Sequence, residues 1–157
     1  MSGFDPRALV TAVAASGARY AIIGGVAVGL HGNPRVTFDL DIIVPASAED
    51  RQRLFDALEA ELDDVAKAKR WVEEGGNARL DTELGTLDVL EEGVKELFWP
   101  RIEADLVMRE AGDGTPIALS GLGTLVALKR LANRPLDRAD LAALEEIHGE
   151  LPDALEP

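Results

Sequence analysis

The sequence contains no cysteine and only two histidines, His31 and His148, among its 157 residues. The lack of cysteine excludes disulfides, thiolate catalysis and cysteine-based zinc sites. Two histidines are too few for a histidine-rich metal site. Aromatic residues make up only 4% of the chain, so the core must be built from Leu, Val, Ala and Ile. With 46% apolar residues, the chain is still hydrophobic enough to form a compact core.

Long hydrophobic runs are also missing. No stretch reaches the ~18 apolar residues of a membrane span, and the N-terminus lacks the basic start and apolar run of a signal peptide. We therefore expect a cytoplasmic protein with no membrane partner. The net charge is −13, and such a surplus repels phosphate backbones, so binding to duplex DNA is not expected. The surplus serves solubility, or belongs in part to a metal site or a basic protein partner.

Helices and strands are expected to alternate along the chain. The patterns predict strands at 20–23, 38–44, 78–84, 86–90 and 117–119. They predict helices after Asp5, at 26–31, after Ser47, from Lys95 until Pro100 disturbs it, after Ser120, and from an Asp137 cap to His148. The segment 65–77 gives no clear pattern. The economical interpretation is one α/β domain over 1–157, with a core at about 5–110 and a C-terminal strand and helices at about 111–150.

Two aspartates stand two residues apart in the strand predicted at 38–44. Because side chains alternate along a strand, Asp39 and Asp41 point to one face, while Phe38 and Leu40 point to the other. Adjacent carboxylates repel each other unless a cation lies between them, and Mg²⁺ prefers oxygen ligands. The pair is therefore either a metal site or a solvated pair at the strand end, capping a turn or pairing with an arginine.

A glycine pair, Gly24-Gly25, ends the preceding strand and opens a short helix. Glycines let a phosphate approach the backbone amides, and a helix N-terminus favours an anion. A phosphate cradle would then lie beside the carboxylate pair; the alternative is an ordinary strand–helix turn. The pair is not the dinucleotide-binding fingerprint, because the glycines that follow it fall at 29 and 32.

The segment that joins these features is Ile23-Gly-Gly-Val-Ala-Val-Gly-Leu-His-Gly-Asn-Pro-Arg-Val-Thr-Phe-Asp39-Leu-Asp41-Ile. It resembles the nucleotidyltransferase superfamily, most of all the minimal branch and the AbiEii-type toxin relatives. That signature is a glycine pair (often Gly-Ser), a helical turn, Asp-x-Asp and a third carboxylate on a later strand. Asp88, in Thr-Leu-Asp-Val-Leu, matches the third carboxylate. The resemblance implies an α+β fold, with a mixed sheet flanked by helices and a C-terminal helical part.

A second match lies downstream, in Leu125-Val-Ala-Leu-Lys129-Arg-Leu-Ala-Asn-Arg-Pro-Leu-Asp137-Arg-Ala-Asp-Leu. It resembles the C-terminal motif of the same relatives. The resemblance implies that Lys129 reaches the phosphates of a bound nucleotide and that Asp137 orders the helix junction. The alternative for Lys129 is a solvated helix lysine. At the first motif, Gly25 stands where serine is frequent, which removes one hydroxyl contact to phosphate.

Two further residues precede the carboxylates. Arg35 either contacts phosphate or holds Asp39 in place. Thr37 lies two residues before Asp39 and so on the same strand face; it either donates a hydrogen bond to the carboxylates or is explained by strand propensity alone. His31 is interpreted as a packing residue at a helix end rather than as a catalytic base.

The predicted reaction transfers a nucleoside monophosphate from a nucleoside triphosphate to a hydroxyl or phosphate acceptor. Its catalytic residues, and ligands of Mg²⁺ or Mn²⁺, would be Asp39, Asp41 and Asp88; the nucleotide-binding residues would be Gly24, Gly25, Arg35, Thr37 and Lys129. The acceptor stays open among a protein, a small molecule and an RNA end. The alternative is a non-catalytic protein of the same fold that binds a nucleotide or serves as one half of a toxin–antitoxin pair. A haloacid-dehalogenase-like phosphatase is disfavoured, because Ile43 stands where that motif requires threonine.

Overall fold

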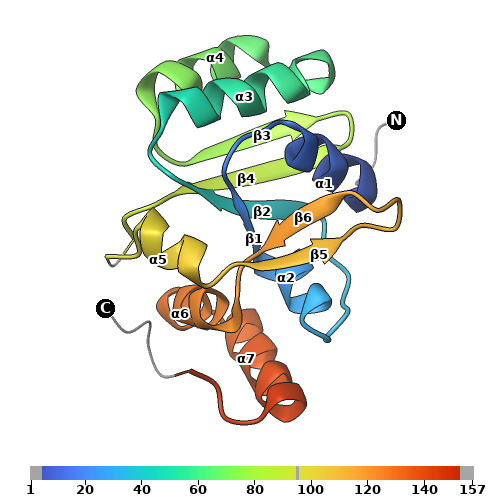
Figure 1. Cartoon of the computed structure of the whole chain (residues 1–157), viewed down its shortest axis with the longest axis vertical. Coiled ribbons are helices and arrows are strands. Elements are labelled where there is room, and N and C mark those ends of the chain that lie inside the picture. The colour runs from blue at the N-terminus through green and yellow to red at the C-terminus, as the bar shows by residue number, and fades with distance from the viewer. Residues whose placement is uncertain (1–4, 95, 153–157) are drawn as a thin grey trace.

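A computed structural model describes residues 5–94 and 96–152, in which six strands form one mixed sheet (Figure 1). The strand order is β3-β4-β2-β1-β6-β5. The β2–β4 and β1–β6 pairs are parallel, and the other three pairs are antiparallel. The strands are β1 (Ala21–Ile23), β2 (Asp39–Val44), β3 (Ala78–Thr82), β4 (Gly85–Glu91), β5 (Val107–Glu110) and β6 (Pro116–Leu119).

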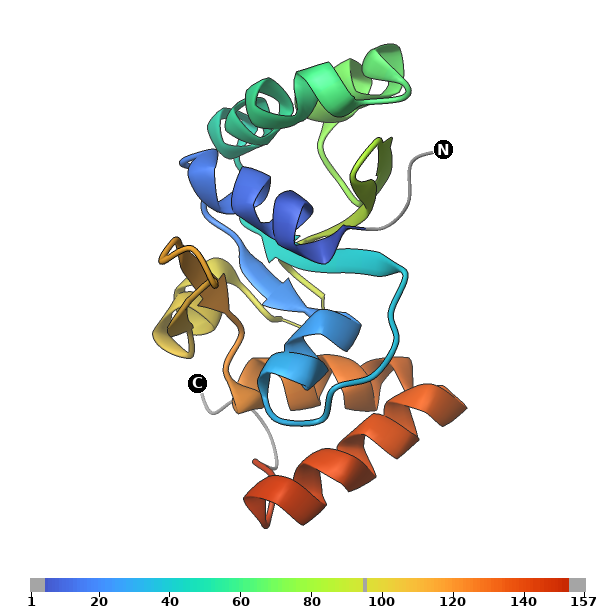
Figure 2. The ribbon, with the colours of Figure 1, turned by 90° about the vertical axis from the view of Figure 1, so that its right-hand side faces the viewer.

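Helices pack on both faces of this sheet. They are α1 (Pro6–Ala15), α2 (Gly24–Leu30), α3 (Ala48–Leu58), α4 (Val65–Glu74), α5 (Trp99–Ala104), α6 (Leu122–Ala132) and α7 (Pro135–His148), with a 3₁₀ turn, η1 (Glu59–Glu61), after α3. Figures 1 and 2 place α3 and α4 at one end of the molecule and α6 and α7 at the other. This is the α/β fold with a mixed sheet and C-terminal helices that the sequence predicts.

The two faces of the sheet differ in polarity because strand side chains alternate. One face carries Ile22, Leu40 and Ile42, which pack with α1, α3 and α4 in the main hydrophobic core. On the other face, Ile23 and Ile43 pack with α5 in a smaller cluster. The aspartates of β2 alternate with the buried residues Leu40 and Ile42, so they lie on this second face. The smaller cluster leaves part of the second face uncovered, and that is where the acidic residues lie.

Local signals placed several elements correctly. The side chain of Asp5 accepts a hydrogen bond from the Ala8 amide, and Ser47 accepts one from the Asp50 amide, so both cap their helices as predicted. The segment 65–77, which gave no clear pattern, contains α4 (Val65–Glu74).

Two predicted helix starts were wrong, and one strand was not predicted. The helix expected from Lys95 begins at Trp99. Pro100 does not disturb a helix; it lies in the first turn of α5, where its missing N–H costs nothing. Asp137 is not the N-cap of α7, because that helix already begins at Pro135. Asp137 instead accepts a hydrogen bond from the Arg134 amide at the helix start. Strand β5 was not predicted, since this edge strand exposes most of its residues, Met108 among them.

The two histidines make contacts that join the end of α2 to Ser120 and to the end of α7. His31 is buried at the end of α2, with Nε2 2.7 Å from the Ser120 carbonyl oxygen. The Nε2 of His148 lies 2.6 Å from the carbonyl oxygen of His31. His31 is therefore a packing residue at a helix end, as the sequence indicated. Among the described residues, no helix has the length and apolar character needed to cross a membrane.

A hydrogen bond between Tyr20 and β6 can be tested for its contribution to stability. Its buried hydroxyl accepts a hydrogen bond from the Ala118 amide at 3.0 Å. Tyr20→Phe removes only the acceptor and leaves a buried N–H without a partner. We expect the free energy of unfolding, measured by urea denaturation, to fall by about 1–3 kcal/mol. An unchanged value would show that this hydrogen bond does not contribute to the attachment of β6.

Candidate functional site

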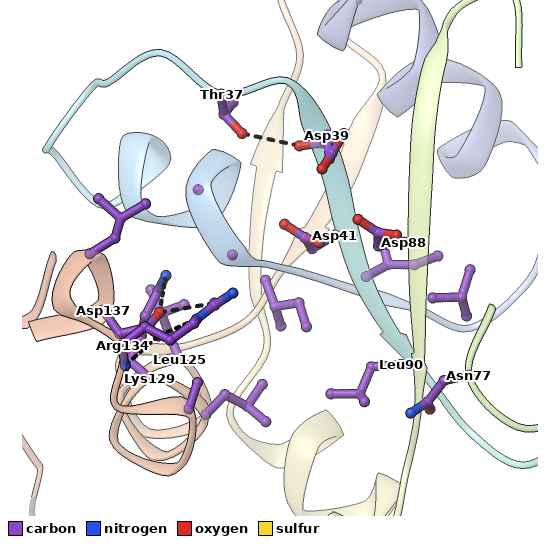
Figure 3. A pocket seen from close by; sticks show the side chains of 18 of the residues that line it. Thr37, Asp39, Asp41, Asn77, Asp88, Leu90, Leu125, Lys129, Arg134 and Asp137 are labelled. Carbon is purple, nitrogen blue, oxygen red and sulfur yellow. Dashed lines mark hydrogen bonds and ion pairs between the residues drawn. The ribbon is translucent and has the colours of Figure 1, made fainter. Parts of the chain in front are cut away.

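All eight residues predicted to form the site line one pocket of about 950 Å³. They are Gly24, Gly25, Arg35, Thr37, Asp39, Asp41, Asp88 and Lys129. Figure 3 shows the three carboxylates on β2 and β4, facing α6 and α7 across the pocket. The histidines, in contrast, do not line it.

The acidic side of the pocket depends on the parallel pairing of β2 with β4. In this register Asp41 lies opposite Asp88, and Asp39 lies opposite Thr86. Paired residues on neighbouring strands project to the same face, so the third carboxylate lies beside the first two. Asp39 and Asp88 keep about a third of their side-chain surface exposed, at 32% and 30%. The carboxylates therefore remain accessible from the pocket.

This crowding raises the pKa values of two carboxyl groups. Burial raises the pKa of Asp41 to about 7, with the charges of Asp88 and Asp39 acting in the same direction and Lys129 opposing them. Burial is also the main cause that raises the pKa of Asp88, although the guanidinium of Arg79 opposes the shift. Both groups thus bind a proton more tightly than an ordinary aspartate, as expected where negative charge is not fully compensated.

Arg79 lies beside the same carboxylates. It is the β3 residue opposite Asp88. Its Nη2 lies 3.4 Å from Asp39 Oδ2, and its Nη1 lies 3.6 Å from Asp88 Oδ1. The metal-site and arginine-pair interpretations of the sequence therefore concern the same carboxylates. As they stand, no three or more His, Asp or Glu side chains in the described part of the chain have the arrangement of a metal site.

The glycine pair is required by its neighbours. Gly24 has a positive φ of 67°, and a Cβ there would overlap the carboxylate of Asp41. A Cβ at Gly25 would lie 3.0 Å from both Arg35 Nη2 and Thr37 Oγ1. A serine side chain in place of Gly25 would lie beside the hydroxyl of Thr37 and the guanidinium of Arg35, both of which line the pocket.

The opposite side of the pocket carries cations that α7 holds in place. Lys129 is buried, and its Nζ donates to Asp137 at 3.0 Å and to Asp140 at 2.9 Å. Arg35 donates to Asp140 through Nε and Nη2, both at 3.0 Å. Arg134 donates to Asp137 through Nε at 2.7 Å. Three cations thus share two buried carboxylates, which leaves a positive charge beside the pocket.

Several expected contacts differ in detail. Arg35 holds Asp140 rather than Asp39. The hydroxyl of Thr37 donates to the backbone carbonyl of Asp39, not to a carboxylate. Phe38 does not face the core but is 76% exposed. The last two differences share one cause, because β2 begins at Asp39 and the strand alternation does not extend to the residues before it.

Three residues of the pocket region were missed as site residues. Arg79 could have been found from the hairpin: the turn that pairs Thr82 with Gly85 also sets Arg79 opposite Asp88. Arg134 and Asp140 lie in the quoted C-terminal motif, but the sequence gave no reason to connect them to the pocket. Asp140 contacts Arg35 from 105 residues away, and only the folded chain shows such a contact.

Of the comparisons with known proteins, the one with solved structures found a protein of similar fold. No family model matches the chain, and no curated protein matches it significantly. The structure is similar to a Thermotoga maritima crystal structure described as a "putative nucleotidyltransferase", with a TM-score of 0.57 and 11% sequence identity. The match covers 90% of this chain and 91% of the other. The chain therefore has a nucleotidyltransferase-like fold, and at this identity the similarity extends to the fold alone.

The raised pKa of Asp41 predicts a pH-dependent stability in EDTA. Between its ordinary pKa of 3.8 and about 7, the unfolded chain has released this proton while the folded chain keeps it. Stability then falls as the pH rises through this window and levels off above it. Asp41→Asn cannot ionise, so we expect it to exceed wild type at pH 8 by on the order of 2–4 kcal/mol, with the difference vanishing near pH 4.

Urea denaturation from pH 4 to 8 measures this difference. The control is Asp63→Asn, which neutralises an exposed aspartate that does not line the pocket and should follow wild type at every pH. A constant difference between Asp41→Asn and wild type would contradict the prediction, since a structural hydrogen bond gives that result.

A second prediction concerns Lys129. This residue lines the pocket, and because it is buried we expect it to stabilise the fold as well. Lys129→Met leaves Asp137 and Asp140 buried with one cation fewer. We expect a loss of about 3–5 kcal/mol in the free energy of unfolding. Adding Asp140→Asn should restore part of it, because one buried charge is then removed. A stability unchanged by Lys129→Met would mean that the lysine is only weakly coupled to α7.

Proposed function

We propose that the protein is a metal-dependent nucleotidyltransferase that moves a nucleoside monophosphate from a nucleoside triphosphate to a hydroxyl or phosphate acceptor. One observation carries the proposal: a single pocket has three carboxylates on one side and cations on the other, with Gly24 beside Asp41 and Gly25 beside Arg35. A metal–triphosphate complex has the complementary charges, since its metal needs oxygen ligands and its phosphates need cations. The nucleotidyltransferase-like fold supports the same assignment.

The carboxylates fit a divalent ion by their chemistry. Asp39, Asp41 and Asp88 supply only oxygen donors, which suit Mg²⁺ and Mn²⁺. Burial, with the neighbouring carboxylates acting in the same direction, raises the pKa values of Asp41 and Asp88, and a bound cation would favour their charged forms. The absence of a side chain at Gly24 leaves room for the Asp41 carboxylate. For binding, Asp39 and Asp88 must exchange Arg79 for the ion.

In this proposal Asp39, Asp41 and Asp88 would hold the ions, which would neutralise the phosphates and activate the acceptor oxygen. Asp88 would also accept the acceptor's proton, and its raised pKa suits that role. Lys129 uses two of its three N–H donors on Asp137 and Asp140; the third remains for a phosphate. The exposed guanidinium of Arg134 and the Gly24-Gly25 amides would complete phosphate binding; the Thr37 hydroxyl could donate to a phosphate only after it releases the Asp39 carbonyl.

The net charge of the protein limits which acceptors we expect. A net charge of −13 disfavours duplex DNA and, more weakly, RNA. We therefore favour a protein side chain or a small molecule as the acceptor, in a toxin-like role of the AbiEii type. The contacts of Arg79 favour a second candidate function, in which the protein binds a nucleotide or masks a basic partner without catalysis. That function has no need of metal.

Thermal unfolding with and without metal separates the two functions. We expect Mn²⁺ with ATP, at about 100 times the dissociation constant, to stabilise the fold by about 2.7 kcal/mol. The melting temperature should then rise by several degrees. Asp41→Asn should abolish this rise, because a neutral amide is a poor ligand for a hard cation. Asp63→Asn, outside the pocket, should keep it.

Pyrophosphate release from each nucleoside triphosphate measures turnover with the same variants. Release that requires metal and is lost in Asp41→Asn supports catalysis. Stabilisation by ATP that is equal in EDTA and in Mn²⁺, without release, supports the non-catalytic function instead. A protein indifferent to both metal and nucleotide would contradict catalysis and nucleotide binding alike, and would leave only the masking of a basic partner.

A further inference from the structure

We propose that Arg79 is a displaceable counter-cation of the carboxylate site, and that it sets the affinity for metal by competing with the ion for Asp39 and Asp88. This inference rests on the proposed metal-dependent function. It assigns to Arg79 a positioning role toward the metal ligands, which neither the sequence motifs nor the fold indicates.

The geometry is that of a bridge. Two nitrogens of one guanidinium face two carboxylates on two strands, Asp39 on β2 and Asp88 on β4. A guanidinium has no acceptor atom and stays charged at any ordinary pH, so it cannot join the coordination of an ion. Because both carboxylates are candidate ligands, an ion that uses them must displace Arg79.

Two features make Arg79 easy to displace. Its side chain is 57% exposed, and it lies on β3 at the edge of the sheet, so it can turn into solvent. Its contacts of 3.4 to 3.6 Å are longer than the about 2.7–2.9 Å of a strong charged hydrogen bond. Lys129 is the opposite case, since it is buried and bonded at 2.9 and 3.0 Å. Among the cations of the pocket, Lys129 is thus fixed and Arg79 is removable.

Competition has two linked consequences. Without metal, Arg79 lowers the repulsion between the carboxylates, so its removal should destabilise the protein. With metal, the ion supplies that charge, so the same removal costs nothing and binding no longer includes the displacement of an arginine. The variant should therefore bind metal more tightly, and its stability deficit in EDTA should disappear at saturating metal.

The test is Mn²⁺ binding without nucleotide, by calorimetry or by electron paramagnetic resonance of free Mn²⁺, on wild type, Arg79→Met and Arg109→Met. Arg109 is an exposed arginine on β5, the opposite edge strand, and does not line the pocket. Both variants change the net charge equally. We expect the dissociation constant to fall about fivefold or more in Arg79→Met and to stay within about twofold of wild type in Arg109→Met. Melting temperatures in EDTA and in saturating Mn²⁺ provide the second readout.

The outcomes separate this inference from the proposed function. Equal Mn²⁺ affinity in wild type and Arg79→Met overturns the role of Arg79 and leaves the metal site standing. Equal tightening in both variants also overturns it, since net charge alone then explains the effect. Binding by Arg79→Met but not by wild type supports the inference in its strongest form. Failure of all three proteins to bind Mn²⁺ overturns the metal-dependent function, and the inference with it.

Discussion

The parallel pairing of β2 with β4 is the constraint on which the site depends. It sets Asp41 opposite Asp88, one strand spacing away, with Asp39 two residues along the same face. Like charges this close are unfavourable unless something compensates them, and the surroundings show two responses. The pKa of Asp41 rises to about 7, through burial first and the charges of Asp88 and Asp39 second, and Arg79 extends from the neighbouring strand toward the other two carboxylates. The hydrophobic face of the same strands fixes this register, since a shift of one residue would turn Leu40 and Ile42 out of the core.

Across the pocket from this acidic face, the C-terminal helices hold positively charged side chains. Asp137 and Asp140 are almost fully buried, and together they fix Lys129, Arg35 and Arg134. A lysine on its own would be a flexible point charge; between two carboxylates it has a defined position. The same contacts join α6, α7 and the segment before β2, so the side of the pocket proposed to bind phosphate is also part of the packing. Residues here therefore cannot be divided cleanly into functional and structural ones.

Much of this could be predicted from the sequence, for identifiable reasons. The alternation of Asp39, Leu40, Asp41 and Ile42 fixed which side chains share a face, and the match at Asp88 identified the neighbouring strand. Contacts that depend on tertiary structure could not be predicted. Asp140 holds Arg35 across 105 residues of sequence, and Phe38 is exposed because β2 begins one residue later than its hydrophobicity suggested. The edge strand β5 has little apolar alternation, because most of its side chains face solvent.

Lys129 and Arg35 are held more firmly than Arg79, and this difference matters for the proposed function. The side that would bind phosphate is already ordered, because Lys129 and Arg35 are held by buried carboxylates. The side that would bind metal is not, because Asp39 and Asp88 must first release Arg79. A free ion therefore gains only the carboxylates and must displace the arginine. A metal–triphosphate complex gains the ordered cations in the same step, which offsets that displacement. If the proposed function holds, the pocket would discriminate against free metal and favour the metal–nucleotide complex, so metal and nucleotide should bind with positive cooperativity.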